Sequence, residues 1–175
     1  MNKTITAFAC GLAMLTAAIA SAAAMPSMMM TSNASQMASL HALAGTWTCK
    51  LTFKSAGKSI TANETKTIAA YGTGWMHGIS TISRNGHRMA QNDSYWGYNA
   101  RHGHWVAITI DSSSNYQVET SSSTSLNGST WTVAYPGRAH AMSTLRLTGA
   151  TFAITSSWTS PRSGKMVSSS EVCSK

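Results

Sequence analysis

The sequence has few carboxylates: five Asp and Glu residues stand against 13 Lys and Arg residues. No two carboxylates occur at a spacing that indicates the acid–base pair of a glycosidase. A Gly-x-Ser-x-Gly elbow and a phosphate-binding glycine loop are also missing. The cations are scattered, whereas nucleic-acid-binding proteins concentrate them in a stripe. We therefore assign no catalytic residue, expect no nucleic-acid partner, and expect a binding protein rather than an enzyme.

Long apolar runs are missing except at the N-terminus, where "TITAFACGLAMLTAAIA" spans residues 4–20. This run follows Lys3 and is followed by the small residues "SAAA", which is the anatomy of a cleaved signal peptide. It is too short and too rich in alanine for a membrane span. We expect cleavage after Ala24, with Ala22 or Ala23 as alternatives. Residues 1–24 are thus a predicted signal peptide, and the rest is expected to be secreted or periplasmic without an integral membrane segment.

The chain after the predicted cleavage site has a formal charge near +7, because only Lys3 of the 13 cations lies in the signal. Residues 25–34, "MPSMMMTSNA", have no periodicity and are expected to be a disordered leader. Methionine thioethers can bind copper(I). No Cys or His cluster accompanies them, so we expect no metal site. Residues 35–175 have the length of a single domain.

Residues 35–44 carry apolar residues at helical spacing and are expected to form a short helix ending at Gly45. The remaining sequence is rich in Thr, Ser, Val, Ile and aromatic residues, with turn signals such as "SAGK" and "RNG" between short segments. Short connections make neighbouring strands antiparallel. We expect nine or ten strands, at residues 45–54, 59–70, 75–83, 87–98, 104–111, 116–125, 130–135, 140–147, 151–159 and 166–174.

Only two cysteines, Cys49 and Cys173, remain after the predicted signal. In an exported protein such a pair is most simply a disulfide, and the alternative is two free buried thiols. The two residues lie in the first and last expected strands. A disulfide requires Cα atoms within about 7 Å, and an up-and-down meander meets this only if it closes. The sequence therefore predicts an all-β, antiparallel barrel of about 8–10 strands preceded by a short helix.

The last strand contains a carboxylate whose direction the sequence leaves open. If Cys173 points inward, strand alternation turns Glu171 inward as well, unless a bulge intervenes. A buried carboxylate needs a cation or hydrogen-bond donors. Arg146 and Lys50 are the candidate partners, and the sequence does not choose between them.

Three short motifs resemble those of the lipocalin-like (calycin) barrels, in particular a set of bacterial exported proteins of unknown function. They are "LAGTW" (residues 43–47), "GYNARHGHWVAITID" (residues 97–111) and the C-terminal "SSSEVCSK". The resemblance implies that Gly45 and Trp47 mark the narrow end of the barrel, where the Trp closes it beneath the helix. The Thr-Asp-Tyr strand-end motif of the well-known carriers is absent, and no functional residue carries over.

Aromatic residues alternate along several expected strands, and we expect them to point into the barrel. An eight-stranded or larger barrel can hold one small ligand, or side chains alone can fill it. We expect a small apolar or aromatic molecule to bind in this lumen. The candidate ligand-binding residues are Trp75, His77, Tyr95, Trp131, Tyr135 and Trp158.

The histidines show no ligand spacing for a metal. His102 and His104 could reach one ion, but a zinc site needs three or four ligands, so exposed turn histidines are expected. A haem held by His140 or His77 has no supporting signature, and we expect no cofactor. The alternative function is a protein-binding barrel, such as an inhibitor of an exported hydrolase, that presents loops to a protein partner.

Overall fold

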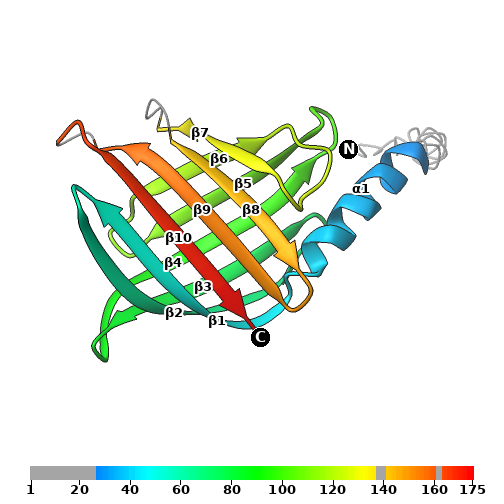
Figure 1. The fold of residues 1–175 in the computed structure, drawn as a ribbon. Coiled ribbons are helices and arrows are strands. Elements are labelled where there is room, and N and C mark those ends of the chain that lie inside the picture. The colour runs from blue at the N-terminus through cyan, green and yellow to red at the C-terminus, as the bar shows by residue number, and fades with distance from the viewer. Residues whose placement is uncertain (1–26, 137–140, 161–162) are drawn as a thin grey trace, which may run out of the picture.

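The computed structural model describes residues 27–136, 141–160 and 163–175, in which one helix precedes ten antiparallel strands (Figure 1). The predicted signal peptide, residues 1–24, lies outside the described residues. No helix in the described part is long and apolar enough to cross a membrane. The elements are α1 (Ser27–His41), β1 (Gly45–Ser55), β2 (Lys58–Tyr71), β3 (Trp75–Arg84), β4 (His87–Asn99), β5 (His104–Asp111), β6 (Tyr116–Ser121), β7 (Thr130–Tyr135), β8 (Met142–Thr148), β9 (Thr151–Thr159) and β10 (Met166–Ser174).

The ten strands of the described chain form a closed up-and-down barrel, in which each strand pairs with the next and β1 pairs with β10. This confirms the predicted fold class. The strand positions also agree closely with the sequence, except that β6 ends at Ser121 instead of residue 125. Closure leaves none of these ten strands at an open edge, which protects such a sheet from edge-to-edge association.

Two of the hairpin turns are two-residue connections with a left-handed backbone. Asn85 and Gly86 have φ of 51° and 78°, and Ala56 and Gly57 have φ of 49° and 78°. A two-residue turn with positive φ at both positions matches the right-handed twist of the flanking strands, and Gly adopts it without steric cost. These turns set the register of β1 with β2 and of β3 with β4.

The first and last strands lie side by side and are joined by a disulfide. Cys49 and Cys173 are directly opposite each other in the β1–β10 ladder, with Cα atoms 4.0 Å apart and a covalent bond between their sulfurs. The predicted pairing is confirmed. In the chain-entropy model, a loop of 124 residues closed in this way contributes about 5 kcal/mol to stability.

The helix α1 begins at Ser27 and ends at His41, whereas the sequence predicted a helix over residues 35–44 and a disordered leader over 25–34. Met and Ala favour the helix, and neither Gly nor Pro interrupts residues 27–41. Leu40 and Leu43 are almost fully buried against the end of the barrel at which β1 starts. The domain boundaries themselves stay a prediction.

Trp47 closes this end of the barrel from within. Its ring is buried, its indole Nε1 donates a hydrogen bond to the Leu43 carbonyl at 2.7 Å, and it packs edge-on against Phe152. Lys175 Nζ lies 4.6 Å from the centroid of the Trp47 ring, in a cation–π contact. Gly45 has φ of +129° and lies under the Lys175 side chain. The opposite end, at the turns 55–58 and 84–87, faces away from α1 (Figure 1).

Candidate ligand-binding chamber

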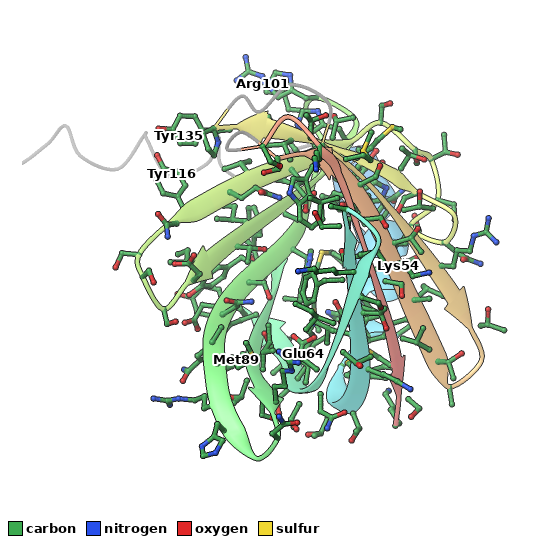
Figure 2. The ribbon with its side chains drawn as sticks, turned by 60° about the vertical axis from the view of Figure 1, so that its left-hand side comes forward. Lys54, Glu64, Met89, Arg101, Tyr116 and Tyr135 are labelled. Atoms are coloured by element: carbon green, nitrogen blue, oxygen red, sulfur yellow. A yellow bond between two sulfur atoms is a disulfide. The ribbon has the colours of Figure 1, made fainter. Side chains whose placement is uncertain are left out.

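The inner face of the barrel surrounds a chamber of about 470 Å³. This volume lies within the usual range of small-molecule sites. Figure 2 shows Glu64 within the ring of strands, among the side chains that fill the interior. The apolar part of the wall consists of Leu51, Phe53, Ile82, Trp96, Ala141, Met142, Ile154 and Trp158. The polar part includes Glu64, Lys66, Ser80, Asn92, Ser94, Thr109, Gln117, Glu119, Ser143, Ser156, Ser169 and Glu171.

A smaller apolar cavity of about 50 Å³ lies on the α1 side of the chamber. Four residues border both spaces, so the two are adjacent: Trp96, Glu119, Ser143 and Ile154. The rest of the small cavity is apolar and includes Leu40, Leu43, Ile68, Leu126, Trp131, Leu145 and Phe152. The interior therefore changes from apolar near α1 to mixed polar and aromatic further along the barrel.

Trp96 is positioned in the wall by a glycine on the neighbouring strand. A Cβ atom on Gly78 would lie 2.7 Å from the Trp96 ring, so only glycine leaves room for the indole there. An aromatic ring that covers a strand glycine is a known stabilising arrangement in sheets. Trp75 covers Gly97 in the same way on the outer face. The β3–β4 pair is thus built around two glycine–tryptophan contacts, one on each side.

A buried lysine joins two of the chamber carboxylates. Lys66 Nζ lies 2.5 Å from Glu171 Oε1 and 3.4 Å from Glu64 Oε1, and all three side chains are largely buried. Glu171 points inward, which decides the direction that the sequence left open. Its partner is Lys66, whereas the candidates named from the sequence, Lys50 and Arg146, are exposed on the outer face.

The charges of this cluster shift one another's titration. Burial raises the pKa of Glu64, the Glu171 carboxylate raises it further, and the ammonium of Lys66 only partly opposes this. Burial lowers the pKa of Lys66, but Glu171 and Glu64 together outweigh it, so the net direction is upward. Oε2 of Glu64 is buried and accepts no hydrogen bond from the described residues. The Lys66 ammonium therefore contacts two carboxylates, and Oε2 of Glu64 remains without a hydrogen-bond donor among the described residues.

Glu119 lies elsewhere on the chamber wall and has no cationic partner among the described residues. Ser143 Oγ donates to Glu119 Oε1 at 3.1 Å and also lies 2.9 Å from Ser156 Oγ. Because the single hydroxyl proton of Ser143 goes to Glu119, Ser156 is the donor to Ser143. Burial raises the pKa of Glu119, and the hydrogen bond from Ser143 only partly opposes this.

The protein separates its charges between the inside and the outside of the barrel. Three of its five carboxylates, Glu64, Glu119 and Glu171, line the chamber. The described cations other than Lys66 are all exposed: Lys50, Lys54, Lys58, Arg84, Arg88, Arg101, Arg146, Lys165 and Lys175. A basic outer surface thus encloses an acidic interior.

Two of the six predicted lumen residues lie inside, and four do not. Trp131 borders the small cavity and Trp158 borders the chamber. On β3 the buried residues Met76 and Ser80 point inward, so Trp75 and His77, which alternate with them, point outward. Tyr95 is directly opposite His77 and stacks on it outside. Tyr135 is half-exposed and stacks on Tyr116, and Figure 2 shows this pair outside the ring of strands.

The prediction that Tyr135 on β7 faces the lumen is wrong for a local reason. Glu119 pairs with Val133, but Val118 pairs with Tyr135, because the register shifts between residues 118 and 119. Such a bulge inserts one residue and reverses the side to which the following residues point. Tyr135 therefore points outward, although its alternation with Trp131 predicted that it would point into the lumen.

Aromatic and aliphatic side chains therefore gather on the outside of β3–β7 and the adjoining end of β2. His77 stacks on Tyr95 with ring centroids 4.6 Å apart, and its Nε2 lies 3.0 Å from Asp93 Oδ1. Tyr71 packs edge-on against both rings. We call this surface the outer aromatic face; it comprises Tyr71, Trp75, His77, Ile79, Tyr95, Ile110, Tyr116 and Tyr135.

The histidines do not form a shared site in the described part of the chain. His102 and His104 stack beside the β4–β5 turn with centroids 5.8 Å apart. His77 is on the outside and cannot reach the chamber, and His140 lies outside the described residues. The one described group with three metal-ligand atoms is Cys49, Glu171 and Cys173. Its two sulfurs are bonded to each other, so they are not free to bind an ion.

No known family profile and no curated protein sequence matches this chain. Its fold is similar to that of Rv2717c from M. tuberculosis, with a TM-score of 0.64 and 12% identity over 80% of this chain and 96% of that one. It is also similar to the S-type phycobiliprotein lyase CPES from Guillardia theta, with a TM-score of 0.52 and 8% identity over 86% and 98% of the two chains. These likenesses show that the chain shares its overall fold with both proteins.

Proposed function

We propose that this protein binds one small molecule inside its barrel. The observation that carries the proposal is the 470 Å³ chamber, whose wall combines Trp96, Phe53 and Trp158 with a limited set of buried polar groups. Apolar walls provide affinity, at about 25 cal/mol per Å² of apolar surface removed from water. A few placed polar groups provide orientation and specificity. The chamber is more polar than the sequence predicted, so we expect an amphipathic ligand with an aromatic or aliphatic body.

The proposal is tested by blocking the chamber without altering the outer surface. Ser156 lines the chamber, whereas the adjacent Thr155 is exposed on the outside of β9. We expect the neutral aromatic probe N-phenyl-1-naphthylamine to bind the wild-type protein with enhanced fluorescence. Ser156→Trp should abolish this binding, and the matched variant Thr155→Trp should retain it. If the probe does not bind the wild-type protein, or binds the two variants equally, the lumen is not the binding site.

A second experiment addresses the natural ligand. Protein purified from its own host and analysed by native mass spectrometry should carry a bound small molecule. The same analysis of Ser156→Trp should show the unliganded mass alone.

We also propose that the protein is exported. The signal-like residues 1–24 and the Cys49–Cys173 disulfide support this, because disulfides persist mainly in oxidising compartments. Expression of residues 1–175 should yield a mature chain beginning at Met25, as measured by intact mass. A chain that keeps residues 1–24 in the cytoplasm would contradict export.

A second candidate function is protein binding, for example inhibition of an exported hydrolase. The outer aromatic face favours it, because Tyr71, Tyr116 and Tyr135 are about half exposed on one side of the barrel. Large exposed apolar patches on soluble proteins mark interaction sites. Replacement of Tyr116 and Tyr135 together by Ser should relieve inhibition of a purified host hydrolase while N-phenyl-1-naphthylamine still binds. Ser156→Trp should have the reverse effect, so the two functions are separable.

A further inference from the structure

We infer that the chamber selects molecules that carry a protonated amine next to an aromatic body, with Glu119 as the receiving carboxylate. This inference rests on the proposed lumen function and adds the charge class of the ligand. It follows from the balance of charges inside the barrel, from an unsatisfied acceptor, and from the position of Glu119 relative to the aromatic wall.

The charges of the chamber do not balance. The described residues that line it include three carboxylates, Glu64, Glu119 and Glu171, and one cation, Lys66. Lys66 is engaged by both Glu171 and Glu64. A buried charge is costly unless it is paired and hydrogen-bonded. A ligand ammonium would provide the missing positive charge, whereas a ligand carboxylate would add a fourth negative charge.

An unsatisfied polar atom points to the same class of ligand. The Glu64 side chain is only 3% exposed, and its Oε2 accepts no hydrogen bond from the described residues. Buried carboxylate oxygens in native proteins nearly always have partners. The interior therefore has one buried carboxylate oxygen that can still accept a hydrogen bond. An ammonium carries three N–H donors and no acceptor, which suits such a site.

Glu119 is the carboxylate best placed to receive the amine. Its Oε1 accepts a hydrogen bond from Ser143, so the group is oriented, yet it has no ion pair among the described residues. In the sheet ladder Ala107 lies directly opposite both Trp96 and Glu119. Ala107, Trp96 and Glu119 all border the small cavity that adjoins the chamber, so unfilled space lies beside both the indole and the carboxylate. A ligand aromatic group against Trp96 would place its amine toward Glu119, where the indole also favours a cation.

The test compares three ligands of nearly equal size and different charge at pH 7. They are 2-(1-naphthyl)ethylamine, 2-(1-naphthyl)ethanol and 1-naphthylacetate, titrated into the wild-type protein by calorimetry. We expect the amine to bind about tenfold tighter than the alcohol, which corresponds to about 1.4 kcal/mol. The carboxylate should bind more weakly than the alcohol.

Two variants locate the effect. Glu119→Gln keeps the size of the side chain and a hydrogen bond with Ser143 but removes the charge. It should lower the affinity for the amine to that for the alcohol. Asp93→Asn removes one carboxylate from the outer face instead and should leave all three affinities unchanged. Equal binding of the three ligands to wild type would overturn the inference while the lumen function stands. If neither these three ligands nor N-phenyl-1-naphthylamine binds, the proposed lumen function itself is overturned.

Discussion

Lys66 and Glu171 come from strands that are not neighbours, β2 and β10, and meet inside the barrel with Nζ and Oε1 2.5 Å apart. They are 105 residues apart in the chain, and β1 separates their strands. Their contact therefore depends on closure of the sheet.

Lys66→Met should destabilise the barrel strongly, because it leaves Glu64 and Glu171 buried without their shared cation. Removal of one partner of a buried ion pair costs about 3–5 kcal/mol. The loss is measured as the change in free energy of unfolding in urea. Lys50→Met on the exposed side of β1 is the matched control and should change stability by less than about 0.5 kcal/mol. Similar losses in both variants would mean that the buried cluster has no special role.

Stability should depend on pH through Glu119. Burial raises the pKa of this carboxyl above its ordinary value of 4.5, so the folded state binds a proton more tightly than the unfolded state. Its favourable contribution is complete below pH 4.5 and is lost as pH rises through the raised pKa. Glu119→Gln should therefore raise the free energy of unfolding at pH 7, by on the order of 1 kcal/mol.

The measurement for Glu119 is a series of thermal unfolding curves from pH 4 to pH 8. The gain from Glu119→Gln should shrink toward pH 4, because the wild-type carboxyl is then neutral. A gain that is constant across this range would show that ionisation of Glu119 is not its source.

Loss of the disulfide should weaken the whole barrel. The double variant Cys49→Ala/Cys173→Ala should lose about 2–5 kcal/mol, since the bond closes a long loop between the first and last strands. The loss is measured by urea unfolding without reductant. Added reductant should lower wild-type stability to a similar extent and leave the double variant unchanged. An effect of reductant on the double variant would contradict this explanation.

Gly78→Ala should disturb Trp96, because its new Cβ would lie 2.7 Å from the ring. Overpacking of this kind costs about 1–3 kcal/mol. Near-ultraviolet circular dichroism should report the displaced indole, and urea unfolding should report the loss. Gly74→Ala is the matched control, since a Cβ there meets no atom within 4 Å. Equal behaviour of the two variants would show that the Gly78–Trp96 contact does not constrain the wall.

The direction of each strand's inner face could have been derived by counting across the turns. Cys49 points inward, and the two-residue turn after β1 pairs it with Glu64. The β2–β3 turn then pairs Glu64 with Ile82. Directly paired residues share a face, so Ile82 is inside, and alternation places His77 outside. The sequence analysis placed Trp75, His77 and Ile79 inside because their side of β3 is rich in large apolar and aromatic residues. That side is instead part of the outer aromatic face.

The sequence by itself determined the strands, the turns, the closure of the meander and the pairing of Cys49 with Cys173. These depend on local propensities, turn chemistry and one covalent constraint, all of which are readable along the chain. Only the tertiary structure decided that Lys66 neutralises Glu171, that Glu119 lacks a cation, and that Tyr135 is outside. Those outcomes depend on register across several strands, including the shift between β6 and β7 at Val118 and Glu119, and a shift of one residue reverses which side chains meet.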